Sequence, residues 1–256
     1  MKRYRAVAVL ALLLGVGAMV YGGVNLLSTR QLYQEGQAAY EVIGSQVRAS
    51  AAETWAPPPA TPERLPIPPL QIDFTALKAI NQDAVAWLYS PDTVIDYPVM
   101  QTDNYSYYLS HLPDGTVNKN GSLFIDYNNA ADFSGQLTVI YGHHMKSGLM
   151  FGSLKGYKNQ KYYEEHPYMY LYTEAGNYRL DLIYGSVIGA GQWRERAFMY
   201  EENLDALLAY AAHNTTFKSD VTYAEQDRIV VLSTCSYEFN DARYVVLGIL
   251  RPEWGD

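Results

Sequence analysis

Eight short apolar runs, divided by turn-forming residues, constrain the fold of this 256-residue chain more than any other feature. They cover residues 85–89, 94–100, 122–126, 137–141, 168–173, 178–188, 228–235 and 243–250. Pro-Asp, Asp-Gly and Asn-Gly pairs lie among them, and such pairs mark turns between strands. The pattern therefore predicts a mostly antiparallel sheet or barrel.

Two helices are expected beside these strands. Asp73 is a candidate N-cap, and Phe74, Leu77 and Ile80 follow at helical spacing. A second helix, over residues 201–213, has one apolar face and acidic residues in its first turn, where the helix dipole favours them. It precedes the seventh apolar run, so it is expected as an insertion between strands.

An uncharged apolar stretch at residues 6–29 follows Lys2, Arg3 and Arg5. A helix needs about 20 apolar residues to cross a bilayer, so this stretch is long enough. Basic residues before it favour a cytoplasmic N-terminus and export of the rest. A cleaved signal peptide is the alternative, but its apolar region is typically about 7–15 residues long. We expect a cytoplasmic tail at 1–5 and a single transmembrane anchor at 6–29.

Residues 30–69 are expected to form a stalk and a Pro-rich linker. Seven of the chain's twelve prolines lie between Trp55 and Pro69, and such segments are extended, semi-rigid spacers. The folded domain is then 70–256, which is long enough to bury a core of its own.

The exported part carries a strong negative charge. Three of the 19 Lys and Arg residues precede the anchor, which leaves 16 against 27 acidic residues, a net charge of −11. Nucleic-acid-binding surfaces are basic, so a nucleic-acid partner is excluded. The single cysteine also excludes a disulfide-stapled module, so stability must come from the core.

Cys235, the only cysteine, is the first candidate for chemistry. It ends the run 228–235 and precedes a polar loop at 236–241. Side chains alternate along a strand, so Ser233 and Cys235 share one face. A thiol at a strand end beside a loop is accessible to a substrate. The alternative is a buried, inert thiol that packs as a small apolar side chain.

Arg243 opens the next run after a short loop, so the two strands are expected to form a hairpin with Arg243 near Cys235. A guanidinium in that position can stabilise the oxyanion that forms when sulfur attacks a carbonyl. It also favours thiolate over thiol. The alternative is a surface arginine at the start of a strand.

A cysteine nucleophile needs an acid–base partner, usually histidine. His143 and His144 follow the fourth run, at a strand end like Cys235, and on geometry alone either serves. His111, His166 and His213 are expected in structural or exposed positions. A zinc site is not expected because the pair lacks a third ligand at a recognisable spacing. No Gly-x-Ser-x-Gly elbow marks a serine nucleophile.

These motifs resemble those of the class B sortases, cysteine transpeptidases of Gram-positive cell surfaces. Leu-Ser-Thr-Cys at 232–235 is similar to the Thr-Leu-x-Thr-Cys signature, with Val231 where Thr is usual. Tyr-Gly-His-His-Met-Lys at 141–146, continued by Met-Phe-Gly-Ser-Leu at 150–154, resembles the histidine motif. Segments 73–88, 97–99, 104–109 and 121–127 are also similar, so the resemblance covers residues 70–251.

The resemblance implies a mainly β fold: an eight-stranded β-barrel with N-terminal helices and one inserted helix before the Cys strand. It assigns Cys235 as the nucleophile, His143 as the catalytic histidine and Arg243 as the arginine, and it makes His144 a neighbour. It implies neither a cofactor nor a metal. Positions that line the family's substrate groove correspond to Ser233, Tyr141 and Asn104.

The implied function is that of a membrane-anchored transpeptidase outside the cell. It would cleave a C-terminal sorting signal of the Leu/Asn/Ser-Pro-x-Thr-(Gly/Asn) kind after Thr. The acyl group would pass to an amine of peptidoglycan, which attaches surface proteins to the cell wall. The implied partners are therefore sorting-signal proteins, a peptidoglycan amine and the membrane.

Three other functions stay open. A pilin-polymerising sortase would use a Lys side chain as the acceptor. A non-catalytic surface binding domain would leave the cysteine inert. An L,D-transpeptidase is another exported Cys/His enzyme, but its cysteine typically follows Gly and is soon followed by Arg, unlike Thr234-Cys235-Ser236 here.

Overall fold

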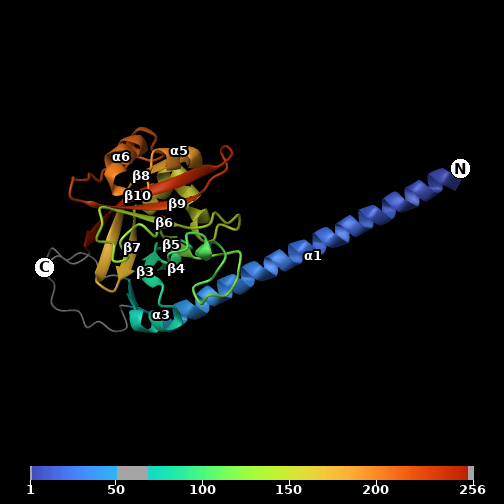
Figure 1. The fold of residues 1–256 in the computed structure, drawn as a ribbon, viewed down its shortest axis with the longest axis horizontal. Coiled ribbons are helices and arrows are strands. Elements are labelled where there is room, and N and C mark those ends of the chain that lie inside the picture. Colours follow the sequence, from blue (N-terminus) through green and yellow to red (C-terminus); the bar gives the residue numbers. More distant parts are fainter. Residues whose placement is uncertain (1, 51–68, 253–256) are drawn as a thin grey trace.

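The computed structural model describes residues 2–50 and 69–252, and most of the second range forms a closed eight-stranded β-barrel (Figure 1). The barrel order is β10-β8-β7-β3-β4-β5-β6-β9. This confirms the expected barrel. Its strands are β3 (Ala84–Tyr89), β4 (Asp96–Met100), β5 (Leu123–Ile125), β6 (Leu137–Tyr141), β7 (Tyr168–Thr173), β8 (Gly176–Gly189), β9 (Arg228–Cys235) and β10 (Ala242–Pro252).

The barrel is mostly antiparallel, as predicted, but two neighbouring pairs are parallel. These are β4 with β5 and β6 with β9. The β6–β9 pair determines the position of the site because the C-terminal ends of parallel strands meet at the same rim. Hydrophobic alternation predicts the strands themselves but not this pairing.

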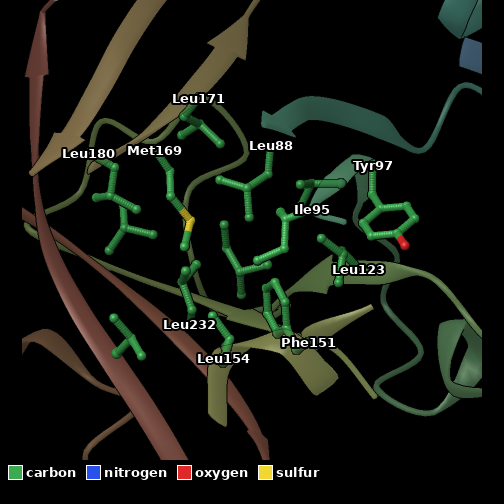
Figure 2. Packing of buried hydrophobic residues seen from close by; sticks show 14 of the residues in the cluster. Leu88, Ile95, Tyr97, Leu123, Phe151, Leu154, Met169, Leu171, Leu180 and Leu232 are labelled. Atoms are coloured by element: carbon green, nitrogen blue, oxygen red, sulfur yellow. The ribbon is translucent and has the colours of Figure 1, made fainter. Parts of the chain in front are cut away.

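The interior of the barrel is filled by alternate side chains of its strands. Leu88, Leu171, Leu180 and Leu232 come from four different strands and are fully buried together, with Phe151 beside them (Figure 2). Burial of one such side chain contributes about 1.5–3 kcal/mol. The barrel is therefore a packed core without a ligand channel between these residues.

The opposite faces of β9 and β10 point outward and are covered by helices. Ile229 and Val231 pack with Leu207 and Leu208 of α6 (Leu204–His213), and α5 (Ala190–Glu195) lies beside it (Figure 1). This confirms the inserted helix; its predicted first turn is the 3-10 helix η3 (Glu201–Asn203). Because odd-numbered β9 residues face outward, Ser233 and Cys235 lie on the outer wall, not inside the barrel.

Short elements complete the domain. Asp73 caps α3 (Phe74–Ile80) as predicted, since its side chain accepts a hydrogen bond of 2.9 Å from the Ala76 amide. The strands β1 (Arg48–Ser50) and β2 (Leu70–Ile72) form a separate antiparallel pair. The other elements are η1 (Tyr107–Leu109), η2 (Phe151–Lys158) and α4 (Gln160–Glu165).

One continuous helix, α1 (Lys2–Val47), covers the expected anchor and the first part of the expected stalk. Its N-terminal part projects away from the barrel (Figure 1), and at 1.5 Å per residue the helix is about 70 Å long. Among the described residues, it is the one helix long and apolar enough to cross a membrane. Its last turns are not a free spacer, because Tyr40, Ile43 and Val47 are buried against the domain.

The expected Pro-rich linker, apart from Pro69, lies outside the described residues. So do Met1 of the expected cytoplasmic tail and residues 253–256 of the expected domain. The division of the chain at residues 5, 29 and 69 stays a prediction.

Candidate active site

Cys235 and Arg243 are direct partners across the β9–β10 hairpin. This confirms the predicted hairpin. Residues directly opposite in an antiparallel pair have Cβ atoms about 4.5–5.5 Å apart and share one face of the sheet. Both side chains are only partly buried. The thiol and the guanidinium therefore project together from the outer wall of the barrel, where a substrate can reach them.

The parallel pairing of β6 with β9 brings the histidines to the same place. Tyr141, the last residue of β6, pairs with Ser233, so the turn that carries His143 and His144 begins beside the end of β9. Two hydrogen bonds join the strand ends here: the Gly142 amide donates to the Ser233 carbonyl (3.1 Å), and the Thr234 hydroxyl donates to the Gly142 carbonyl (2.7 Å). The cysteine and the histidine turn are thus held by one local network.

The ring of His143 is held by a main-chain carbonyl. Its Nε2 lies 2.7 Å from the carbonyl oxygen of Leu109 in η1. A carbonyl only accepts, so Nε2 carries a hydrogen and donates it. This leaves Nδ1 as the atom that can take or give a proton. The Phe151 amide donates to the His143 carbonyl (3.0 Å) and fixes the backbone beneath the ring.

His144 contacts the main chain of the cysteine. Its Nδ1 lies 2.7 Å from the carbonyl oxygen of Cys235, and its ring meets the edge of Tyr237 at 5.0 Å. By the same argument as above, Nδ1 is its protonated nitrogen. The structure therefore gives the two histidines different surroundings, a distinction that residue spacing alone did not make.

The three residues expected to line a groove differ in exposure. Ser233 is buried at 3% exposure between Tyr141 on one side and Val245 on the other. The Tyr141 hydroxyl donates to Asp126 (3.1 Å), and burial raises the pKa of that hydroxyl, so it stays protonated. Asn104 is exposed on a loop. Its side-chain oxygen accepts hydrogen bonds from its own loop, at Ser106, so it shapes this loop locally.

Tyr105, next to Asn104, is a residue that sequence analysis did not single out. It is 45% exposed, and its ring meets the edge of Tyr141 at 5.4 Å. Burial raises the pKa of its hydroxyl, while a bond with Tyr141 and the positive charge of Arg243 act to lower it. The loop before η1 therefore reaches the surroundings of Arg243. The closely spaced tyrosines at 105, 107 and 108 are the sequence signal that could have pointed to this loop.

A second cluster, also missed, holds the loop after Cys235. Lys158 of η2 donates to the Ser236 hydroxyl (3.0 Å) and forms an ion pair with Glu238. The Ser236 hydroxyl also bonds to Glu238, and the Ser236 amide donates to the Ala242 carbonyl (2.8 Å). These contacts fix the first residue after the cysteine.

Across residues 2–50 and 69–252, no group of three or more His, Cys, Asp or Glu side chains is placed to hold a metal ion. The site consists of a thiol, two imidazoles and a guanidinium at one rim. Such a set can perform nucleophilic attack, proton transfer and oxyanion stabilisation.

Comparison with known proteins identifies the class of this barrel. No family model matches the chain. The chain is 33% identical to sortase B of Listeria monocytogenes over 178 residues, 68% of this chain and 72% of that protein. The solved structure of Clostridium perfringens sortase B covers 70% of this chain and 99% of its own, at 28% identity and a TM-score of 0.64. A Staphylococcus aureus sortase B–substrate complex covers 70% of this chain and 84% of its own, at 28% identity and the same TM-score.

The fold and these relatives define a sortase, a cysteine transpeptidase. The identity to the Listeria protein extends over more than two thirds of its length. The chain belongs to the sortase B family, as its motifs indicated.

Proposed function

We propose that the chain is a membrane-anchored transpeptidase that cleaves a C-terminal sorting signal after Thr and transfers the acyl group to a cell-wall amine. The observation that carries the proposal is the register of three strand ends. Arg243 lies opposite Cys235 across β9–β10, and His143 follows the end of β6, whose last residue, Tyr141, pairs with Ser233 of β9. Nucleophile, oxyanion donor and proton carrier therefore come from three neighbouring strands.

In the first step, the Cys235 thiol gives its proton to His143 Nδ1, and the resulting thiolate attacks the Thr carbonyl carbon of the signal. Negative charge develops on the carbonyl oxygen, and the Arg243 guanidinium donates to it. The C–N bond then breaks, and His143 gives the proton from its Nδ1 to the leaving amine. Its Nε2 stays hydrogen-bonded to the Leu109 carbonyl, so Nδ1 is the nitrogen left for the reaction. The products are a thioester on Cys235 and a free amine.

In the second step, an amine of a peptidoglycan stem or cross-bridge attacks the thioester. His143 takes a proton from this amine, and the sulfur leaves as Cys235 is regenerated. The new amide joins the surface protein to the cell wall. Water competes as the acceptor, so hydrolysis of the thioester is the expected side reaction when no amine is supplied.

Ser233 and Tyr141 lie on the same outer wall as Cys235, and with Asn104 of the exposed loop before η1 they would line the groove that receives the signal. That a Staphylococcus aureus sortase B was solved as a substrate complex supports a substrate groove in this family. The apolar part of α1 would anchor the chain, with the barrel outside the cell. This arrangement brings the site to signals on proteins that are themselves still at the membrane.

The test uses the full chain in lipid nanodiscs and a panel of quenched peptides. Each peptide carries one signal of the Leu/Asn/Ser-Pro-x-Thr-(Gly/Asn) kind. After incubation with each peptide, the intact mass of the protein is measured. We expect cleavage after Thr and an acyl adduct on Cys235, both absent from Cys235→Ala. Stem peptide and purified pilin, supplied separately, then identify the acceptor amine. Cleavage by Cys235→Ala, or no cleavage of any peptide, would refute the proposal.

A further inference from the structure

The C-terminal end of α1 contacts the residues that hold His143 in place. Tyr40 is buried at 6% exposure, and its hydroxyl donates to the carbonyl oxygen of Gly121. Burial raises the pKa of this hydroxyl, so it stays a donor. The helix that carries the apolar segment is thus bonded to the loop before β5.

Gly121 lies directly against the histidine and its partner. Its φ is +59°, a conformation that other residues rarely adopt. A Cβ there would lie 2.6 Å from the Tyr108 carbonyl oxygen, 3.0 Å from the Leu109 carbonyl oxygen and 3.0 Å from His143 Cδ2. The Leu109 carbonyl is the atom that holds the His143 ring. A shift of Gly121 therefore moves the carbonyl, the imidazole, or both.

The ring of Tyr40 supports the same histidine by a second route. It meets the Tyr97 ring edge-on at 5.0 Å, and the Tyr97 hydroxyl accepts a hydrogen bond of 3.3 Å from the Met150 amide. The next amide, of Phe151, donates to the His143 carbonyl. Tyr40 thus touches the supports of both the ring and the backbone of His143.

Polar side chains dock the helix at this place. The Asn118 side chain donates to the Leu32 carbonyl (2.9 Å), and the Asn120 side chain donates to the Tyr33 carbonyl (3.3 Å). Gly36 faces them, and a methyl group there would overlap the Asn120 amide. The helix approaches closely because glycine leaves that space, so contact with the loop at 118–121 is specific and not a general apolar contact.

We infer that Tyr40 is a positioning residue for the proposed proton carrier, so that α1 completes the active site as well as holding the barrel. This rests on the proposed function of His143. Displacement of a reacting group by about 1 Å can lower a rate about 100-fold, and loss of one supporting bond is a smaller disturbance. We expect kcat to fall about 10-fold in Tyr40→Phe, with KM nearly unchanged because the groove residues are not contacted.

The test compares three variants of the full chain in nanodiscs. Tyr40→Phe removes only the hydroxyl, and Gly36→Ala pushes the helix from the loop without changing Tyr40. Val47→Ala is the matched control, because Val47 is buried on the same helix but packs in a separate cluster with Leu77 and Trp87. We expect all three variants to lose a comparable amount of thermal stability. The first two should also lose kcat, and the control should retain it.

Side-chain nitrogen NMR gives a readout that does not depend on cleavage. His143→Gln assigns the His143 signal, and wild type should show the tautomer protonated at Nε2. We expect this signal to broaden or move in Tyr40→Phe and to persist in Val47→Ala. The inference would be overturned if Tyr40→Phe kept the wild-type kcat and the wild-type His143 tautomer. It would also be overturned if Val47→Ala lost as much kcat as Tyr40→Phe. If the wild-type protein cleaves no peptide, the proposed function fails, and the NMR comparison alone decides whether Tyr40 positions the ring.

Discussion

Arg243 is the direct cross-strand partner of Cys235, and no strand residue intervenes between the guanidinium-bearing and thiol-bearing positions. The side chains stand on the outer wall of the barrel, beyond the part of that wall that α6 covers. Within the described residues, the seven ion pairs all involve other groups. One guanidinium nitrogen donates to the neighbouring Ala242 carbonyl (3.3 Å).

Arg243→Ala should therefore remove an oxyanion donor and lower kcat/KM about 100–1000-fold. The kcat/KM of Arg243→Lys should lie between those of wild type and Arg243→Ala, because an ammonium keeps the charge but not the planar arrangement of donors. Arg194→Ala, at an exposed position of α5, is the control and should retain wild-type activity. Peptide cleavage rates measure all three. Unchanged kcat/KM in Arg243→Ala would show that this arginine only ends its strand.

The two histidines should differ in their effect on kcat when each is replaced by the amide residue whose nitrogen can make the same hydrogen bond. His143→Gln can keep the bond to Leu109 but cannot transfer a proton, so kcat should fall about 100- to 10,000-fold. His144→Asn can keep the bond to the Cys235 carbonyl and should retain most activity. If His144→Asn were as inactive as His143→Gln, the assignment of the proton carrier would be wrong.

Local patterns predicted those parts of the molecule that depend on neighbours in sequence. Alternation gives β6 and β7 with their bounds, and the short loop gives the hairpin that joins Cys235 and Arg243. Alternation does not say which distant strands pair. The parallel contact of β6 with β9, and with it the bond from Thr234 to Gly142, was therefore not foreseen. Residue spacing also left His143 and His144 equal; the family resemblance separated them.

The docking of α1 escaped prediction for a related reason. The acceptors in its polar contacts are the main-chain carbonyls of Leu32 and Tyr33. Every residue has such a carbonyl, so the sequence does not indicate which ones make contacts. The donors, Asn118 and Asn120, lie in a loop where asparagine is common for turn geometry alone. Only the fold brings these groups together.

Thr234→Val tests the bond that joins the cysteine strand to the histidine turn. The substitution keeps the shape but leaves the Gly142 carbonyl without this donor, so unfolding free energy should fall about 1–2 kcal/mol. Activity should fall too, because Gly142 directly precedes His143. Thr173→Val is the control, since the Thr173 hydroxyl donates to the Gly176 carbonyl (3.0 Å) and accepts from the Gly176 amide (3.2 Å) in the β7–β8 turn. Urea unfolding should show a stability loss in both variants, and peptide cleavage should show an activity loss only in Thr234→Val. Equal activity of the two variants would show that the hydrogen bond from Thr234 to Gly142 has no role in the site.

The Lys158–Glu238 pair should make stability depend on pH in the acid range. Partial burial acts to raise the pKa of the Glu238 carboxyl, but bonds from Lys158 and Ser236 outweigh it and lower the pKa to about 2 from 4.5. A depressed pKa gives stability that is fully present above about pH 4.5 and lost as pH falls toward 2. The Glu238 side chain is 38% exposed, so solvent screens the pair and about 0.5 kcal/mol is expected.

Urea unfolding of wild type and Glu238→Gln from about pH 7 to pH 3 measures this contribution. The wild type should be more stable by a constant amount down to about pH 5, and the difference should shrink below that. It should also shrink in about 1 M salt, where charges on the surface are screened within about 3 Å. A difference that grows on acidification would mean that Glu238 is protonated in the folded protein and that the pair does not hold the loop after Cys235.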